Sequence, residues 1–461
     1  MRRQYKRWLS QKNNTELSVI FYSDNLDEVN GIANSLRSAC AYMLAQGKNV
    51  RLWGSAFHTR TNGVIEDHFI VLFPRRASME QLGYADSELA FPHLAPILKI
   101  LRRRPPNILE LETPSPGAWM IGFAAKIIGI KVLSNYRTDV PSYTNSLVKQ
   151  AWMRRYVLLL MQVFYRIFRP VISPCRAYKK ILETDIKVPP AQIKILPRGI
   201  PLENFSPLLR AGGESPRNAP PSKEPLLKDP PCVASLHSEA TPPPVQDARR
   251  ADKGIYDPPS LQPHIAGDQW SPLHATPTIK FLYVGRISVE KSIPFLETLW
   301  KQFSKNNSNV ELLFVGGGWY LETLKENMKN CPSAKFAGIK TGKELATIYA
   351  NADFFLFPSG TDTFGNVVVE SLASGTPVLV SDKGGPQDII QNCGKILPFE
   401  NLEEWLAGLK NCVEIYPTPA YQSLRLAAVE RSKDFTLEKM TSAQWDFFKS
   451  IKRTSINLIS G

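Results

Sequence analysis

The sequence of 461 residues predicts an α/β protein built from two similar halves. Short apolar segments alternate with amphipathic helical segments over residues 16–205, and the same alternation returns over residues 277–425. Between them, residues 206–276 are rich in proline and show no sustained period of either 2 or 3.6. Apolar strands that alternate with helices are typical of a parallel sheet covered on both faces. We therefore expect two α/β domains that flank a proline-rich, disordered insertion or linker.

The expected elements follow one another in a regular order. Residues 17–24, 32–47 and 49–54 read as a strand, a helix closed by Gly47 and a second strand, which together make a βαβ unit. Further strands and helices of the first half are expected at residues 68–74, 107–113, 118–129, 131–136, 150–170 and 191–200. Strands of the second half are expected at residues 278–286, 310–318, 334–338, 352–359 and 377–382. We assign residues 1–15 to a basic tail and residues 426–461 to a C-terminal helical segment that crosses back to the first half.

Charge and composition limit the classes of partner. The net charge of +14 and the pI near 9.4 favour an acidic partner such as nucleic acid, anionic lipid or a phosphorylated substrate. The basic N-terminus runs into polar residues, which argues against a signal peptide, and the apolar run at residues 156–165 is half the length of a membrane span. The six cysteines show no CxxC pair and no metal-ligand spacing, so we expect free thiols in a reducing cytosol and no metal site. Their positions are Cys40, Cys175, Cys232, Cys331, Cys393 and Cys412.

Two loops that follow predicted strands carry candidate ligand-binding residues. Gly285, Arg286 and Lys291 follow the strand at residues 278–286, and Pro294 begins the next helix. Ligands of open parallel sheets bind at the carboxyl ends of strands, where an Arg fork, a Lys ammonium and a helix N-terminus suit a pyrophosphate. A solvated charged loop is the alternative. Gly31, just before the first helix, could likewise admit a phosphate or be an ordinary helix-starting glycine.

A second loop and helix hold two carboxylates. Asp362 lies in the polar loop after the strand at residues 352–359, and Glu370 lies about two turns inside the helix that Gly375 ends. Two acids so separated do not suit one shared proton. They suit two contacts along an extended ligand, each accepting hydrogen bonds from hydroxyl groups. The alternative is an unrelated pair of loop and helix-surface acids.

Several motifs taken together resemble one enzyme family. They are "EVNGIANSL", "NYRTDVPSYT", "LPRGIPLENFSP", "GRISVEK", "FVGGG", "FAGIKTGKELATIYANADFFLFPS" and "DTFGNVVVESLASGTPVLVSDKGGPQDII". The chain thereby resembles the retaining GT-B glycosyltransferases of family 4 over nearly its whole length outside the insertion. The form "DTFGNVV" is similar to the branch with bacterial α-mannosyltransferases and, more distantly, sulfoquinovosyltransferases. The resemblance implies a GT-B fold, in which the parallel sheets of two Rossmann-like domains face a central cleft.

The resemblance also implies roles for individual residues. Arg286 and Lys291 match the pair that holds the donor diphosphate, Glu370 matches the acid that binds the ribose hydroxyls, and Asp362 matches the acid that contacts the transferred sugar. Backbone N–H groups of Phe364, Gly365 and Asn366 are expected to face the sugar and phosphates, and residues 338–343 the base. The expected activity is a metal-independent, cofactor-independent hexosyl transfer of the mannose or glucose type from a GDP- or UDP-linked sugar. Residues 16–205 would then bind the acceptor and residues 277–425 the nucleotide sugar.

One position departs from the family. Arg137 stands where most members have His, next to Thr138 and Asp139 on the acceptor side of the donor sugar. Because Arg does not act as a base near neutral pH, a proton relay through this position is not expected. Two interpretations stay open: Arg137 binds an acidic sugar, a phosphate or the acceptor, or it forms a structural ion pair with Asp139.

The basic stretch at residues 151–180 bears on the location of the reaction. It holds seven Lys or Arg residues and no acid, interleaved with aromatic residues. A helix with one core-facing side and one solvated basic side, or docking on an anionic membrane, accounts for this pattern. With the resemblance, it predicts a lipid or glycan acceptor and a cytoplasmic protein held peripherally at the inner face of a membrane. A catalytically inactive GT-B scaffold is the alternative, and a nucleic-acid-binding protein is disfavoured because no recognised motif is present.

Overall fold

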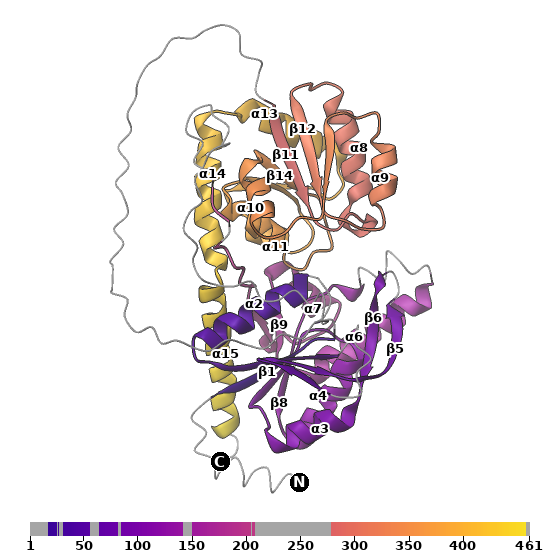
Figure 1. Cartoon of the computed structure of the whole chain (residues 1–461), viewed down its shortest axis with the longest axis vertical. Coiled ribbons are helices and arrows are strands. Elements are labelled where there is room, and N and C mark those ends of the chain that lie inside the picture. The colour runs from indigo at the N-terminus through magenta and orange to yellow at the C-terminus, as the bar shows by residue number, and fades with distance from the viewer. Residues whose placement is uncertain are drawn as a thin grey trace, which may run out of the picture. The chain divides into compact units, whose positions relative to one another are not determined.

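The computed structural model describes residues 17–24, 26, 31–55, 64–81, 84–141, 150–203, 205–207 and 278–457. The basic tail, Cys232 and nearly all of the proline-rich insertion lie outside the described residues. The described chain contains two large sheets, each with helices on both faces, and one two-stranded sheet (Figure 1). Both sheets belong to one compact unit. The predicted α/β class with two sheets of parallel strands is confirmed.

The first sheet has eight strands in the order β10-β9-β8-β7-β1-β2-β4-β3. All neighbouring strands pair in parallel except β3, which runs antiparallel to β4 at the edge. The strands are β1 (Ser18–Tyr22), β2 (Asn49–Ser55), β3 (Ile65–Asp67), β4 (Ile70–Phe73), β7 (Ile108–Leu111), β8 (Lys131–Asn135), β9 (Val171–Ser173) and β10 (Ile193–Ile195). Because successive strands extend to opposite sides of the β1–β7 pair, the switch point of this sheet lies there.

The helices of the first half end where the sequence contains recognised stop and start signals. They are α2 (Gly31–Ala45), α3 (Leu94–Arg103), α4 (Pro116–Ile128), α6 (Ala151–Ile167), α7 (Arg176–Thr184) and the short η1 (Pro190–Gln192). In α4 the hydroxyl of Ser115 accepts a hydrogen bond from the Ala118 N–H at 3.2 Å, Pro116 occupies the first turn and Gly129 caps the C-terminus at φ 98°. An N-cap hydroxyl, an early proline and a left-handed glycine are the expected helix boundaries.

One part of the first half was not predicted. Strands β5 (Arg75–Gln81) and β6 (Tyr84–Pro92) form a separate antiparallel pair between β4 and α3. Our interpretation extended only parallel strand–helix alternation through this region, and the polar composition of the two segments hid their strand character. The antiparallel edge strand β3 was missed for the same reason.

The second sheet has six strands, all parallel, in the order β13-β12-β11-β14-β15-β16. They are β11 (Ile279–Val284), β12 (Val310–Val315), β13 (Ala334–Gly338), β14 (Phe354–Phe357), β15 (Val378–Ser381) and β16 (Gly394–Leu397). The helices of this half are η2 (Val289–Lys291), α8 (Ile293–Ser304), α9 (Leu321–Asn327), α10 (Gly342–Asn351), α11 (Asn366–Ala373), α12 (Pro386–Ile389), α13 (Leu402–Ile415), α14 (Pro419–Ser432) and η3 (Lys433–Phe435). Residue 425, where we expected this half to end, lies inside α14.

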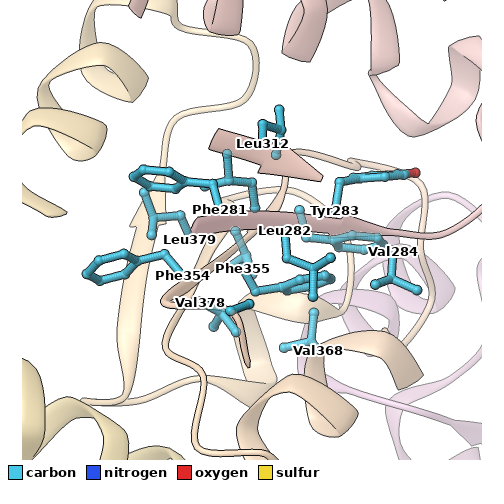
Figure 2. Close-up of a cluster of buried hydrophobic side chains, with 14 of the residues drawn as sticks. Phe281, Leu282, Tyr283, Val284, Leu312, Phe354, Phe355, Val368, Val378 and Leu379 are labelled. Carbon is cyan, nitrogen blue, oxygen red and sulfur yellow. The ribbon is translucent and has the colours of Figure 1, made fainter. Parts of the chain in front are cut away.

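The core of the second half forms around its central strand. Along β11, Phe281 and Tyr283 lie on one face and Leu282 and Val284 on the other (Figure 2). All four are buried, and the ring of Phe281 stacks on that of Phe354 with centroids 5.6 Å apart. A strand that is apolar on both faces requires cover on both faces, which the helices supply. This burial holds the carboxyl ends of β11 and β14 in a fixed position.

The last helix, α15 (Leu437–Asn457), packs on the first half. Its residues Trp445 and Phe448 belong to the same buried cluster as Phe21 of β1 and Leu36 of α2. The amide of Gln444 also donates to the buried carboxylate of Glu110 on β7 at 3.2 Å. The C-terminal segment thus contributes apolar area to the core of the first half.

Candidate functional site

The candidate site lies at the switch point of the second sheet. Strands β11 and β14 are neighbours there, and the chain continues from them to opposite sides of the sheet. The loop after β11 contains Gly285, Arg286 and Lys291, and the loop after β14 contains Asp362. Loops that diverge from a switch point leave room for a ligand beyond the strand ends. The topology therefore brings together residues that are 71 positions apart in the sequence.

The centre of this arrangement is an ion pair. The Lys291 Nζ lies 2.8 Å from the Asp362 Oδ2, and the Ser359 hydroxyl donates to the same oxygen at 2.5 Å. Both charged side chains are largely shielded, with exposures of 11% for Lys291 and 22% for Asp362. Burial acts to raise the pKa of Asp362, but the Lys291 ammonium and the Ser359 hydroxyl outweigh it and hold the pKa below its usual value. Asp362 is therefore an ionised acceptor for donor groups such as hydroxyls.

Arg286 lies at the rim of the same loop. Its Nη1 is 3.5 Å from the Glu290 Oε1, and its side chain is 40% exposed. The Tyr283 hydroxyl donates to the Arg286 carbonyl at 2.9 Å, which fixes the backbone as it leaves β11. The hydroxyl of Ser288 in this loop is buried and has no hydrogen-bond partner among the described residues. A buried polar atom of this kind is rare and marks a place where a bound group could satisfy it.

Helix α11 begins beside the ion pair. Gly365 caps it at φ 106°, a conformation that only glycine adopts readily, and a Cβ there would approach the Pro386 ring at 3.0 Å. The Asn366 Oδ1 is buried without a partner among the described residues. A Cβ placed on Gly31 would lie 3.9 Å from the Asn366 Nδ2, so the first residue of α2 faces the start of α11. The Phe364 side chain is buried and packs against Phe435, which leaves only its backbone to face a ligand.

Glu370 lies on α11, away from Lys291. The Tyr349 hydroxyl of α10 donates to its Oε2 at 3.1 Å. Burial raises the pKa of Glu370 to about 7, although the bond from Tyr349 acts in the opposite direction. The two acids of the site therefore differ in charge state near neutral pH, because Asp362 has a cationic partner and Glu370 has a neutral one.

The loop that carries Asp362 is held in place through its backbone. The Gly385 N–H donates to the Asp362 carbonyl at 2.7 Å, and the Thr361 hydroxyl donates to the Glu290 carbonyl at 2.9 Å. A Cβ on Gly385 would lie only 2.3 Å from the Thr363 carbonyl, so the close approach requires glycine. Gly385 is thus a supporting residue that the sequence analysis did not identify, although its "GG" pair was visible.

Arg137 follows β8 and forms a buried ion pair. Its Nε donates to the Glu112 Oε2, and both side chains are almost fully buried. Of the two open interpretations, a structural ion pair with Asp139 is wrong in its partner, because Glu112 follows β7, the strand adjacent to β8, and pairs with Arg137 instead. Asp139 instead accepts hydrogen bonds from the Tyr136 and Tyr178 hydroxyls at 3.1 and 3.2 Å. Burial acts to lower the pKa of Arg137, but Glu112 outweighs it and the pKa is raised. Thr138 between them is half-buried.

Arg198 is a further charged residue near the ion pair, and we did not predict it. It follows β10, and its Nη2 donates to the Arg137 carbonyl at 3.1 Å and to the Thr363 hydroxyl at 3.0 Å. The Thr363 hydroxyl in turn donates to the Arg137 carbonyl at 2.7 Å. Burial, with the nearby Arg137 charge, lowers the pKa of Arg198 to about 9. Its signal in the sequence was the single basic residue of "LPRGI", which lies inside the element predicted over residues 191–200 and after the observed end of β10.

The segment at residues 338–343 connects β13 to α10. The Gly316 N–H donates to the Gly338 carbonyl at 2.8 Å, so this segment lies beside the glycine-rich loop after β12. A Cβ on Gly317 would approach the Ile339 side chain at 3.2 Å. The Ile339 side chain itself is 76% exposed. An exposed apolar side chain above a glycine loop provides a flat surface for a planar ligand group.

The two halves match two families of one enzyme class. Residues 29–204 match the family described as Glycosyltransferase Family 4, and residues 267–423 match the family described as Glycosyl transferases group 1. Together the matches cover every strand of both sheets except β1. The chain belongs to the GT-B glycosyltransferases of family 4 and group 1.

Curated relatives include a sulfoquinovosyl transferase and α-mannosyltransferases, the two kinds of enzyme that the motif form "DTFGNVV" indicated. The chain is 24% identical to the sulfoquinovosyl transferase SQD2 of Arabidopsis thaliana over 365 residues, 78% of this chain and 58% of the relative. It is 26% identical to the alpha-monoglucosyldiacylglycerol synthase of Streptococcus pneumoniae over 366 residues, 78% of this chain and 70% of the relative. It is 26% identical to a GDP-mannose-dependent alpha-mannosyltransferase of Mycobacterium tuberculosis over 323 residues, 67% of this chain and 65% of the relative. The chain thus spans under two thirds of the length of the first and third of these relatives.

Solved structures agree on the fold. The sucrose-phosphate synthase of Thermosynechococcus elongatus has a TM-score of 0.65 at 16% identity, covering 95% of this chain and 100% of that one. Anabaena Alr3699/HepE in complex with UDP and glucose has a TM-score of 0.61 at 13% identity, covering 94% and 100%. At these identities the likeness establishes the fold alone.

Proposed function

We propose that this protein is a retaining glycosyltransferase that moves a hexose of the mannose or glucose type from a nucleoside-diphosphate sugar to a lipid or glycan acceptor. The observation that carries the proposal is the Lys291–Asp362 ion pair at 2.8 Å, at the switch point of the second sheet. Lys291 is a cation that suits a phosphate, and Asp362 is an ionised acid that suits sugar hydroxyls. The two lie side by side where a ligand of this sheet is expected to bind. The names of the relatives, which specify mannosyl, glucosyl and sulfoquinovosyl transfer, support the class of reaction.

The donor would lie along the start of α11. Arg286 and Lys291 would bind the diphosphate, Asp362 the hydroxyls of the sugar, and Glu370 the ribose hydroxyls at the other end. The backbone N–H groups of Gly365 and Asn366 would add the positive end of the helix dipole. The base, of GDP or UDP, would then lie over residues 338–343. In this arrangement the cations sit where negative charge is greatest, and the acids sit where hydroxyl donors are.

The transfer step needs a stabilised leaving group more than it needs a strong base. The bond from the sugar C1 to the diphosphate oxygen breaks, and the acceptor hydroxyl oxygen forms its bond to C1 on the same face. The proton of that hydroxyl goes to the departing phosphate oxygen. Each well-placed donor to a developing oxyanion is worth about 3 to 4 kcal/mol of barrier, which is the contribution we assign to Lys291 and Arg286. No step requires Arg137 as a base, and charge stabilisation by the two cations makes the reaction metal-independent in this proposal.

The first half would bind the acceptor, with Arg137, Thr138 and Asp139 on the acceptor side of the sugar. The Glu112–Arg137 pair neutralises two buried charges and leaves the Arg137 carbonyl bonded to Thr363, the residue after Asp362. This contact connects the acceptor-side segment to the loop that holds the sugar-binding acid. A backbone shift at Arg137 would therefore be transmitted through Thr363 to the neighbouring Asp362.

A surface on α4 and α6 supports a membrane-bound acceptor. Large apolar side chains are exposed there, with Ile127 at 69%, Trp152 at 67% and Tyr156 at 55%. We call this surface the α4/α6 patch; its members are Phe123, Ile127, Trp152, Tyr156, Leu159, Leu160 and Val163. The α6 members recur at spacings of three and four residues and so share one side of the helix, while Met161, Phe164 and Tyr165 are buried on the other. The Phe123 ring contacts Phe168 just beyond α6, with centroids 5.5 Å apart, which joins the two helices.

Charge beside the α4/α6 patch suits an anionic surface. Arg155 and Arg166 border the apolar side of α6 at helical spacing. Lys126, in the last turn of α4, donates from its ammonium to the Ile167 carbonyl at the end of α6. Exposed apolar groups flanked by cations are characteristic of helices that lie in a membrane interface. None of the helices in the described part of the chain has the length and apolar character needed to cross a bilayer. We therefore propose peripheral binding at the inner, cytoplasmic face of a membrane.

The decisive experiment is a transfer assay with matched variants. The purified chain is incubated with a panel of GDP- and UDP-sugars and lipid extracts, and products are identified by mass spectrometry. Lys291→Ala is expected to weaken nucleoside-diphosphate binding and to abolish product formation. Lys301→Ala is the matched control, because Lys301 forms a 2.7 Å ion pair with Glu297 on α8, outside the site. Both variants are checked for folding by circular dichroism.

Three outcomes are informative. Product formed by wild type and by Lys301→Ala but not by Lys291→Ala supports the proposal, and anomeric analysis of the product tests retention. Nucleotide binding without transfer to any acceptor would instead favour an inactive GT-B scaffold. Equal nucleotide affinity in wild type and Lys291→Ala would overturn the donor site itself.

A further inference from the structure

The Arg198 guanidinium has hydrogen-bonding capacity that the described residues do not use. Only Nη2 forms hydrogen bonds, to the Arg137 carbonyl and the Thr363 hydroxyl. Among the residues that the structure describes, the buried Nε atom has no hydrogen-bond partner and Nη1 donates to none. A guanidinium has five N–H donors in a planar fork, and two of them are accounted for by these bonds. Three donors therefore remain on a group whose orientation Nη2 already fixes.

Arg198 also differs from the other cations around the site in its charge balance. Arg137 is paired with Glu112, Lys291 with Asp362 and Arg286 with Glu290. No carboxylate of the described residues lies within the 4 Å of an ion pair with Arg198, although Glu112 and Asp362 act on it from farther away. A partly buried cation without a direct partner is costly unless an anion joins it.

We propose that Arg198 binds a phosphate group of one of the two substrates. The Nε–H and the two Nη1–H groups remain as charged donors that can each bond a phosphate oxygen, and Thr363 places the guanidinium one residue from Asp362. The inference rests on the proposed function, which supplies two phosphate sources near this point. One is the diphosphate of the donor, and the other is the phosphate of a phospholipid acceptor. Arg198 comes from the first half of the chain, just after β10, whereas Lys291 and Arg286 come from the loop after β11 in the second half.

The alternative is that Arg198 only joins the two halves through Thr363. In that case its replacement would change stability but not the affinity for phosphate in folded protein. The test therefore measures affinity in variants that retain the fold, with Arg198→Gln and Arg198→Lys. The control is Lys194→Gln, which removes a positive charge from the exposed face of β10, four residues away.

Calorimetry on the full chain separates the two sources. In the first arm the ligands are UDP and GDP. In the second arm, with nucleotide present, the ligands are dihexanoyl phosphatidylglycerol and the neutral dihexanoylglycerol, which lacks phosphate. Loss of a charged hydrogen-bond pair is worth at least about tenfold in affinity, so Arg198→Gln should weaken one of the phosphate ligands by that factor. Lys194→Gln should stay within about twofold, as expected for an exposed charge.

The two arms distinguish the donor phosphate from the acceptor phosphate. A loss confined to the nucleotides assigns Arg198 to the donor, and a loss confined to the phosphatidylglycerol assigns it to the acceptor. Unchanged affinity in both arms overturns the inference. If Arg198→Gln does not fold, Arg198→Lys keeps the charge but loses the fork, and several-fold weaker binding is still expected; equal binding would refute the role. Lys291→Ala in the first arm reports on the proposed function separately, because failure of its effect removes the donor site whatever Arg198 does.

Discussion

Replacing Glu370 by Gln should stabilise the protein at alkaline pH while impairing its donor site. The Glu370 carboxylate lies near the centre of α11, and the Tyr349 hydroxyl, at 3.1 Å, is its one hydrogen-bond partner in the described part of the chain. Burial raises the pKa of Glu370 from 4.5 to about 7. Because the folded state binds the proton more tightly than the unfolded state, the stability of the fold falls as the pH rises from about 4.5 through about 7. Gln removes this ionisation and keeps an oxygen that accepts the Tyr349 hydrogen bond.

The size of the effect follows from the shift in pKa. A difference of about 2.5 units at about 1.4 kcal/mol per unit corresponds to roughly 3 kcal/mol of lost stability once the pH exceeds the folded-state pKa. The loss begins as the pH rises past the unfolded value of 4.5 and is complete a little above 7. Burial of the Gln amide costs about 1 kcal/mol at every pH. The cost of the Gln amide does not change with pH. We therefore expect the difference in unfolding free energy between Glu370→Gln and wild type to rise in favour of the variant by about 2 to 3 kcal/mol from pH 5 to pH 8.

Urea denaturation followed by tryptophan fluorescence at pH 5, 6, 7 and 8 measures this gain. Glu403→Gln is the control, since Glu403 is an exposed glutamate on α13 and its replacement should leave the difference constant with pH. Parallel stability curves for Glu370→Gln and wild type across this range would refute the burial argument. The same variant should bind UDP and GDP more weakly at pH 8, because ribose hydroxyls bond a carboxylate more strongly than an amide.

Three further predictions concern other parts of the chain. Arg137→Gln should lower the unfolding free energy by about 3 to 5 kcal/mol, because it leaves Glu112 buried without its cation. In thermal denaturation, the double variant with Glu112→Gln should recover most of this loss, and equal stability of the single and double variants would contradict the prediction. Deleting residues 210–270 and joining the ends by a short Gly/Ser linker should leave nucleotide affinity nearly unchanged, and loss of folding or affinity would show that the insertion packs on the protein. In flotation assays the protein should bind phosphatidylglycerol vesicles at low salt and release them at high salt, since each cation near the surface contributes about 1 kcal/mol. Trp152→Asp with Tyr156→Asp should reduce that binding by more than tenfold, and failure of wild type to float at low salt would favour a soluble acceptor.

The sequence by itself determined the local elements and the residue types of the candidate site. The alternation of apolar runs with helical periods predicted the α/β class and most elements, because burial on both faces of a parallel strand leaves a continuous apolar run. Glycine and proline marked boundaries such as that of α4, since their effect on backbone dihedrals is local. The spacing of Asp362 and Glu370 predicted two separate acids, and the structure gives them different hydrogen-bond partners.

Only the tertiary structure decided which of these residues meet. Strand order is not encoded in local periodicity, so the contact of Lys291 with Asp362 follows from β11 and β14 being neighbours at the switch point. In the same way, Arg137 pairs with Glu112 and not with Asp139, because β7 and β8 are adjacent in the first sheet. The contact of Arg198 with Thr363, 165 residues away, was invisible for the same reason. Local chemistry selects the residue types, whereas the packing of sheets and helices selects their partners.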